Sequence, residues 1–201
     1  MRKRVLLVVS VAILTMVYAQ AQIDFGVRAG LNLTNIKYSG GGFSRSPDMK
    51  PGFQLGIVGE ISVIESFVIQ PGIIFAQQGY KLDKWKTSLN YIQIPVNAMY
   101  KVDLGCANLL LQAGPYFGFG ISGKTKYDGE GSDKIKFGSG DDADIKVLDL
   151  GLGIGAGFQF GAIQAGIGHN FGLMNIDPEN SSDYKVKNNG LAITLTYFFG
   201  K

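Results

Sequence analysis

The chain is poor in the residues that supply cross-links and catalytic chemistry. Its 201 residues include one cysteine, Cys106, and one histidine, His169. A single cysteine excludes an internal disulfide, so stability must come from sheet pairing and packing. A histidine base in a hydrolase or acyltransferase must be positioned by a third group near a nucleophile. No Ser or Asp shares the register of His169 nearby, so we expect neither an enzyme nor a bound cofactor.

Long apolar runs are also missing, apart from one at the N-terminus. A basic start, Met1 to Arg4, precedes an apolar run over residues 5–17 and the sequence Ala19-Gln20-Ala21. This pattern is typical of an export signal with an A-x-A cleavage site. The run is short for a transmembrane helix, and no later stretch of about 20 apolar residues follows. We therefore expect a cleaved signal peptide over residues 1–21 and one mature domain over residues 22–201.

The mature domain also lacks net charge. Removal of Arg2, Lys3 and Arg4 lowers the Lys+Arg count from 19 to 16, which equals the 16 acidic residues. A neutral domain has no basic footprint for nucleic acid, so we expect no nucleic-acid partner. No cysteine directly follows the apolar run, which argues against a lipid-anchored lipoprotein.

The chain does have a regular alternation of apolar residues with glycine or polar residues. From Leu148 to Phe160 every even position is apolar and every odd position is glycine or polar, with Asp149 as the single charge. A period of two places these sets on opposite faces of a β-strand. A soluble surface is about 25–35% charged, so neither face fits water. An apolar outer face and a polar lumen fit a barrel in lipid.

The same alternation recurs along the mature chain and predicts an all-β fold. We expect an eight-stranded antiparallel up-and-down transmembrane β-barrel, because each segment has about the 9–11 residues that a tilted strand needs to cross a bilayer. The segments are 25–33, 53–63, 67–75, 92–100, 109–121, 148–160, 163–173 and 191–199.

The expected connections alternate in length. Short ones span residues 64–66, 102–106 and 161–162, and long ones span 37–51, 80–88, 123–146 and 174–187. Outer-membrane barrels have short periplasmic turns and longer extracellular loops, so both termini should face the periplasm. A soluble lipocalin-like barrel is the structural alternative. It would have almost no surface charge and would tend to aggregate.

Several stretches resemble the PorT-type outer-membrane β-barrel family of Bacteroidetes, often labelled "porin family protein". The stretches are Gly26–Asn35, Gln70-Pro71, Gln77–Tyr80, Leu89–Val96 (Leu-Asn-Tyr-Ile-Gln-Ile-Pro-Val), Gly114-Pro115-Tyr116 and Asn170–Ile176. Members commonly carry an acidic residue after the Gln-Pro pair, where this chain has Gly72. The resemblance implies an outer-membrane location and a barrel fold. Fold alone does not supply an activity.

Few charged residues fall at lumen positions of the expected barrel: Arg28, Glu60 and Asp149, with Asp24 near its periplasmic mouth. Arg28 and Glu60 lie on neighbouring strands at similar depth, which predicts a bidentate ion pair. The cluster could act as an ion filter or as a structural plug of paired charges and amide hydrogen bonds. The plug is favoured, because eight strands leave an interior only just wide enough for side chains.

The third long connection combines acidic residues with glycines and lysines. Oxygen-rich clusters can bind calcium, but the spacing matches no EF-hand and nearby lysines offset the charge, so a solvated, mobile loop is favoured. The acidic residues are Asp128, Glu130, Asp133, Asp141, Asp142 and Asp144. His169 falls on the lipid-facing parity beside Phe171 and is read as an interfacial histidine.

These patterns favour a non-enzymatic structural or surface-interaction protein. The candidate contacts for a surface protein partner are Lys81–Lys86 and the third long connection. Outer-membrane lipid should surround the barrel, which we expect to be a monomer. Two alternatives stay open: a narrow porin-like channel for small solutes, and an accessory component of a secretion system.

Overall fold

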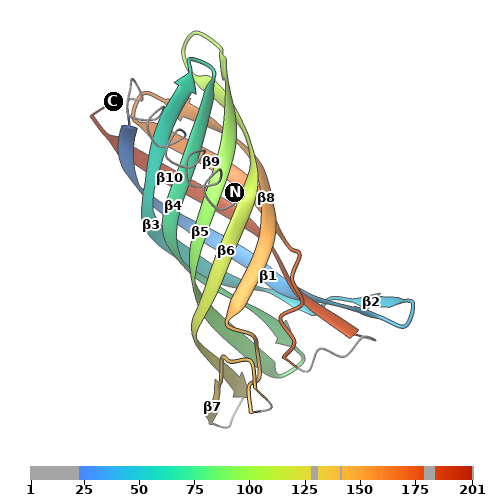
Figure 1. Ribbon diagram of the computed structural model, residues 1–201. Helices are drawn as coiled ribbons and strands as arrows, with labels where there is room; N and C mark the ends of the chain where they lie inside the picture. Colours follow the sequence, from blue (N-terminus) through green and yellow to red (C-terminus); the bar gives the residue numbers. More distant parts are fainter. Residues whose placement is uncertain (1–22, 128–130, 141, 179–183, 201) are drawn as a thin grey trace, which may run out of the picture.

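The computed structural model describes residues 23–127, 131–140, 142–178 and 184–200, and in this part of the chain it is all-β (Figure 1). The expected signal segment lies outside the described residues. The strands are β1 (Ile23–Gly40), β2 (Phe43–Arg45), β3 (Asp48–Ile64), β4 (Phe67–Leu82), β5 (Trp85–Asp103), β6 (Asn108–Tyr127), β7 (Ser132–Ile135), β8 (Leu148–Phe160), β9 (Ile163–Gly172) and β10 (Tyr184–Phe199).

Eight of these strands pair antiparallel in a closed ring. The order is β1-β3-β4-β5-β6-β8-β9-β10, and β10 pairs with β1 from Phe25↔Phe199 to Gly40↔Tyr184. β2 and β7 lie outside the ring and pair only with the ends of β1 and β6. The predicted eight-stranded up-and-down barrel is therefore confirmed. In the described part of the chain no helix is long and apolar enough to span a membrane.

The alternation in sequence becomes an inward and an outward face. On β1 the even positions from Asp24 to Asn32 face the lumen, while the odd positions from Ile23 to Leu33 face outward. Outward side chains such as Phe25, Leu31 and Ile57 are more than half exposed, at 63%, 65% and 57%. Residues 23–33 of a strand tilted by about 40° rise about 25–28 Å, which matches the apolar band of outer-membrane barrels.

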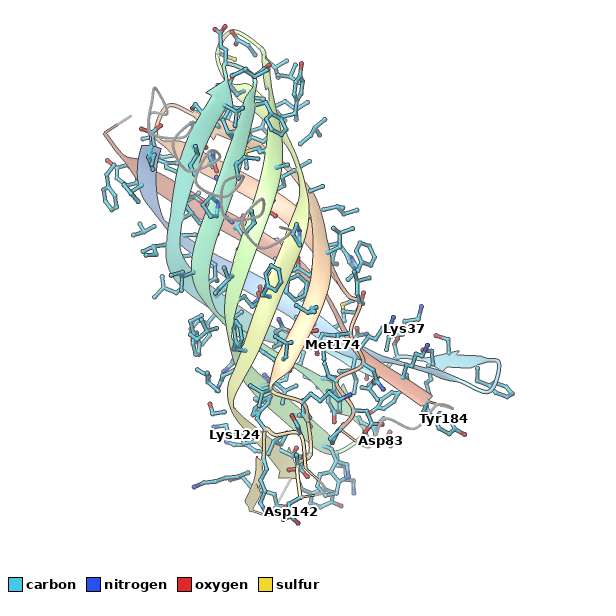
Figure 2. The ribbon with its side chains drawn as sticks, in the orientation of Figure 1. Lys37, Asp83, Lys124, Asp142, Met174 and Tyr184 are labelled. Carbon is cyan, nitrogen blue, oxygen red and sulfur yellow. The ribbon has the colours of Figure 1, made fainter. Side chains whose placement is uncertain are left out.

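The two ends of the barrel differ. We call the end with the connections 65–66, 104–107 and 161–162 the turn end; it also holds the start of β1 and the end of β10. The opposite end, the loop end, carries β2, β7 and the connections 41–47, 83–84, 128–147 and 173–183. Figure 2 labels residues of this end, among them Lys37, Asp83 and Lys124.

The prediction of a second long connection over residues 80–88 is wrong. β4 and β5 continue in register to Leu82↔Trp85 and join through Asp83 and Lys84 alone. Asp83 has a positive φ of 48°, which the tight turns of two-residue hairpins require. Beyond the apolar band the outward positions become polar, as at Lys81, Lys86 and Ser88, while an inward position such as Leu89 is apolar and buried. The outward apolar alternation that marks the lipid-facing segments therefore ends although the backbone pairing continues.

Candidate functional site

The lumen near the turn end is crossed by an amide relay that starts at Arg28. Its guanidinium donates to Thr196 Oγ1 at 2.9 Å and to Gln70 Oε1. Gln70 Nε2 then donates to Gln164 Oε1 at 3.2 Å. In the ring order β4 and β9 are four strands apart in both directions. The Gln70–Gln164 bond therefore joins opposite walls of the barrel.

The relay ends at a buried ion pair. Gln164 Nε2 donates to Glu60 Oε2 at 2.9 Å, and Lys101 Nζ forms a salt bridge with Glu60 Oε1. Glu60 is 0% exposed. Buried charges are tolerated only when paired and hydrogen-bonded, and the relay supplies both conditions for this carboxylate.

The expected bidentate Arg28–Glu60 pair is not formed, because Nε and Nη2 of Arg28 donate to Thr196 and Gln70. The relay links the two residues instead. Arg28 pairs with Gly56 in the sheet, while Glu60 pairs with Asp24, so the two residues are staggered along the barrel. Lys101, the actual ion partner, was missed. It shares the odd-numbered inward parity of Gln93, a signal already in the sequence.

Asp149 belongs to a second network, near the loop end. Its Oδ2 accepts from Tyr116 OH at 3.2 Å and from Asn188 Nδ2 at 2.9 Å. Asn188 Nδ2 also lies 3.4 Å from Tyr91 OH. Tyr91 on β5 and Asn188 on β10 again stand on opposite walls. The structure thus places Arg28 and Glu60 in one network and Asp149 in another.

Glycines on the inner face make room for the aromatic rings of this second network. A Cβ on Gly120 would lie 2.1 Å from the ring of Phe137, and one on Gly151 would lie 2.3 Å from the ring of Tyr116. Phe137 comes from the third connection and meets Tyr91 edge-on, with ring centroids 5.8 Å apart. The loop therefore closes the barrel mouth with an aromatic ring.

Between the two networks the lumen retains small polar cavities. One of about 60 Å³ is lined by Arg28, Gln93, Gln112 and Asn170, among others. Another of about 10 Å³ shares Gln93, whose Nε2 is buried without a hydrogen-bond partner among the described residues. A polar cavity of about 10–15 Å³ holds one water, so the larger one has space for a few water molecules.

His169 takes part in an outward polar ladder. Its Nε2 lies 2.7 Å from Asn189 Oδ1, and its ring stacks on Phe171 at 4.2 Å. Asn189 Nδ2 donates to Asn35 Oδ1 at 3.0 Å. These contacts are amide and aromatic, as at the edge of a membrane band.

The described residues of the third connection include strand pairing that the expected solvated loop did not contain. β7 pairs with β6, and Phe137 bridges to Ile145 in parallel. Asp144 Oδ2 accepts the backbone N–H of Lys136 at 2.8 Å. Asp128, Glu130 and Asp141 lie outside the described residues. Within the part of the chain that the structure describes, no group of three or more His, Cys, Asp or Glu side chains converges as a metal site would require.

Parts of the third and fourth connections form a pocket over the loop end. Lys146 N donates to Ile176 O at 2.8 Å, and Ile176 N donates to Val186 O at 2.9 Å. These two backbone hydrogen bonds hold one wall of a pocket of about 110 Å³. We call it the loop pocket, and its lining is Ile36, Tyr38, Tyr80, Asp144, Ile145, Ile176, Asp177 and Val186.

The chemistry of the loop pocket is aromatic and acidic over an apolar floor. Ile36 and Ile176 are buried, at 3% and 1% exposure. Burial, with the neighbouring Tyr80 and Asp177, raises the pKa of the Tyr38 phenol. Sequence reasoning missed this pocket, because it joins residues from β1, β4, β10 and two loops that share no periodic signal.

Several solved structures resemble the chain. Neisserial surface protein A is 17% identical, with a TM-score of 0.49 over 87% of this chain and 97% of the other. A major outer membrane protein from Thermus thermophilus is 16% identical, with a TM-score of 0.49 over 89% and 100%. Ail, the attachment invasion locus protein of Yersinia pestis, is 13% identical, with a TM-score of 0.46 over 88% and 98%.

The family comparison covers most of the chain. Curated proteins yield no match. Residues 18–177 match the family described as outer membrane protein beta-barrel domain, over a span that includes β1 to β9. The chain therefore belongs to the outer membrane protein beta-barrel domain family and is an outer-membrane β-barrel protein.

Proposed function

We propose that this protein is a non-enzymatic surface-interaction barrel whose loop end faces the cell exterior and binds a protein partner. The observation that carries the proposal is a contrast between the two parts of the molecule. The lumen is bridged by side chains from opposite walls at two levels, whereas the loop segments are assembled into a pocket. Binding groups usually sit on loops held by a rigid scaffold.

The loop pocket defines the chemistry of the partner. Asp144 and Asp177 supply carboxylates, and Tyr38 and Tyr80 supply phenol rings. Carboxylates with aromatic faces suit a cation, and the aliphatic floor suits a methylene chain. We infer that a Lys or Arg side chain of the partner enters this pocket.

Photo-crosslinking on intact cells tests the proposal. A photoreactive residue at Asp142, which is exposed at the loop end, should yield one adduct with a surface protein. The double variant Asp144→Asn/Asp177→Asn should abolish the adduct. The matched variant Asp133→Asn/Asp48→Asn removes two loop-end charges outside the pocket and should keep it. Absence of any adduct, or equal adducts in both variants, would contradict partner binding.

A narrow channel is the second candidate, favoured by the polar cavity of about 60 Å³ in the lumen. Planar-bilayer recording of the purified protein discriminates the two functions. The proposal expects no stable conductance, because two networks cross the path. If the protein is instead an accessory of a secretion system, the crosslinked partner should be a secretion component.

The remaining parts of the proposal concern export and subfamily. We propose that residues 1–21 are a cleaved signal, that the barrel is monomeric in lipid, and that it is of the PorT type found in Bacteroidetes. The Ala19-Gln20-Ala21 site supports the cleaved signal, and the Leu89–Val96 stretch supports the PorT type. Intact-mass measurement should find a mature protein that begins at Gln22, with Gln20 as the alternative start. Retention of residues 1–21 would contradict export by cleavage.

A further inference from the structure

The outward face of β4, β5 and β6 changes character in regular rows toward the loop end. The last apolar row is Phe75, Ile92 and Phe119, which pair across the three strands. The next outward row is Gln77, Asn90 and Ser122. Gln77 Nε2 donates to Asn90 Oδ1 at 3.3 Å, and Asn90 Nδ2 donates to Ser122 Oγ at 2.9 Å. This polar row marks the edge of the apolar band.

A bulge aligns the rows beyond this edge. Asn90 pairs with Ser122, but Tyr91 pairs with Gly120, so Ile121 is the extra residue in β6. Ile121 and Ser122 are both exposed. The bulge shifts the parity of β6, so that its even positions, including Lys124 and Lys126, face outward beyond it.

Two lysine rows follow the polar row. Lys124 pairs with Ser88 on β5 and with Lys134 on β7. One row further, Lys86 pairs with both Lys81 and Lys126. These rows lie two and four residues past the polar row, or about 7 and 13 Å along the strands. We call these five lysines the lysine patch. Figure 2 labels Lys124 near the loop end.

Like charges directly opposite each other destabilise a sheet, and a negative group on the same face offsets this repulsion. Among the register pairs of the described strands, one acidic residue lies on the same outward face as the lysines: Asp48, which is opposite Lys81. Asp133 pairs with Thr125, one position away from the outward row. Burial and the positive charges of Lys81 and Lys124 lower the pKa of Lys50, as expected in a positive field.

The opposite side of the barrel repeats the order of rows. Asn35 and Asn189 pair and hydrogen-bond at 3.0 Å on the outward face of β1 and β10. Two residues further toward the loop end, Lys37 pairs directly with Lys187. The turn end differs, because the exposed charges in and beside its connections include the acidic Glu65 and Asp103. The positive rows are therefore a property of one edge of the apolar band.

We propose that the lysine patch binds the phosphate groups of an anionic glycolipid in the leaflet next to the loop end. The patch lies directly beyond the apolar band, at the level of lipid headgroups, and presents several ammonium groups to one face. Lysine binds phosphate as a point charge, and basic side chains at a membrane surface attract anionic headgroups. A divalent phosphate between Lys81, Lys86 and Lys126 would offset their mutual repulsion.

The proposal goes beyond the protein-binding function and is tested separately from it. Protein is refolded into phosphatidylcholine nanodiscs that contain a small fraction of bisphosphorylated lipid A, which is present in both leaflets, so orientation does not matter. Native mass spectrometry after detergent extraction counts the retained lipid. We expect retention of bisphosphorylated lipid A and not of its dephosphorylated form. Equal retention of the two forms would overturn the proposal.

The triple variant Lys81→Gln/Lys86→Gln/Lys126→Gln should reduce retention about tenfold or more. A matched control, Arg45→Gln/Lys84→Gln/Lys136→Gln, removes three loop-end charges outside the patch and should retain the lipid. The charge-preserving variant Lys81→Arg/Lys86→Arg/Lys126→Arg should also retain it. Equal loss in the control, or no loss in the glutamine variant, would contradict the assignment.

Two further measurements keep the test decisive. If the glutamine variant does not fold, the salt dependence of the wild-type protein decides, because an exposed ionic contact weakens as salt rises; salt-independent retention would overturn the proposal. Inorganic phosphate is titrated into nanodiscs of phosphatidylcholine alone. Lipid A should bind far more tightly than inorganic phosphate, and equal affinities would show that the site takes free phosphate rather than a lipid.

Discussion

Gln70 on β4 and Gln164 on β9 stand on opposite walls of the barrel and hydrogen-bond across the lumen at 3.2 Å. Each amide also binds a charged side chain: Gln70 accepts from Arg28, and Gln164 donates to Glu60. The relay lets a cation and an anion on staggered strands satisfy each other indirectly. It also explains why the lumen is rich in glutamine rather than in ion pairs.

The first prediction concerns the ion pair. Glu60→Gln leaves the Lys101 ammonium in the lumen without its carboxylate, and Glu60 is fully buried while the Lys101 side chain is 13% exposed. We expect a loss of about 2–3 kcal/mol in the free energy of unfolding. Urea unfolding in lipid, followed by heat-dependent gel mobility, measures it. The double variant Glu60→Gln/Lys101→Gln should recover part of the loss, and additive losses would show that the pair is not coupled.

The second prediction concerns Arg28. Arg28→Ala leaves the neutral acceptors Gln70 Oε1 and Thr196 Oγ1 without their donor, so we expect a loss of about 1–3 kcal/mol. No stable conductance should appear, because the Gln70–Gln164 bond and the Asp149 network still cross the lumen. Planar-bilayer recording checks this expectation, and a large new conductance with unchanged stability would favour the channel.

The third prediction is that Asp149→Asn leaves the barrel as stable as the wild type or more stable. Asp149 is 0% exposed, and its Oδ1 has no hydrogen-bond partner in the described part of the chain. The partners of its Oδ2 are neutral donors, Tyr116 OH and Asn188 Nδ2. Asparagine removes the buried charge and keeps an oxygen for both donors. Asp149→Leu is the contrasting variant: it leaves these donors unpaired and should destabilise the barrel by about 1–3 kcal/mol.

The sequence predicted the barrel well, because a period of two assigns every residue of the apolar band to lipid or lumen. It predicted the ends poorly. Lys81 and Lys86 continue the outward faces of their strands with polar residues, so no outward apolar alternation marks these positions. Depth across strands was also misjudged: counting from loop ends ignores the stagger that sets Glu60 beside Asp24 rather than Arg28. Phe137 lies in a loop and contacts Tyr91. No local sequence pattern predicts a contact between a loop residue and a distant strand.

The fourth prediction concerns the aromatic closure of the mouth. A side chain at Gly120 would overlap the ring of Phe137, since even a Cβ would lie 2.1 Å away. Gly120→Leu should therefore expel Phe137 and expose the third connection to protease. Limited proteolysis of the refolded protein should show faster cleavage between Ser132 and Val147. Phe137→Ala is the matched change from the loop side. Cleavage at the wild-type rate in both variants would contradict a closing role for this ring.

The last prediction tests which end of the barrel faces outward, and it uses the single cysteine. Cys106 is exposed in the 104–107 connection at the turn end. If that end faces the periplasm, a bulky polyethylene-glycol maleimide should label Cys106 only after the outer membrane is permeabilised. The variant Gly41→Ser/Gly42→Cys/Cys106→Ser moves the thiol to the loop end, where a Cβ at residues 41 and 42 meets no atom within 4 Å.

This second protein should be labelled on intact cells. Both loop-end glycines have positive φ, at 56° and 82°, so the substitutions strain only the tip of an exposed hairpin. Heat-dependent gel mobility confirms that the barrel is folded before labelling. Labelling of Cys106 on intact cells, with none at residue 42, would reverse the orientation and would remove the basis for a surface partner at the loop pocket.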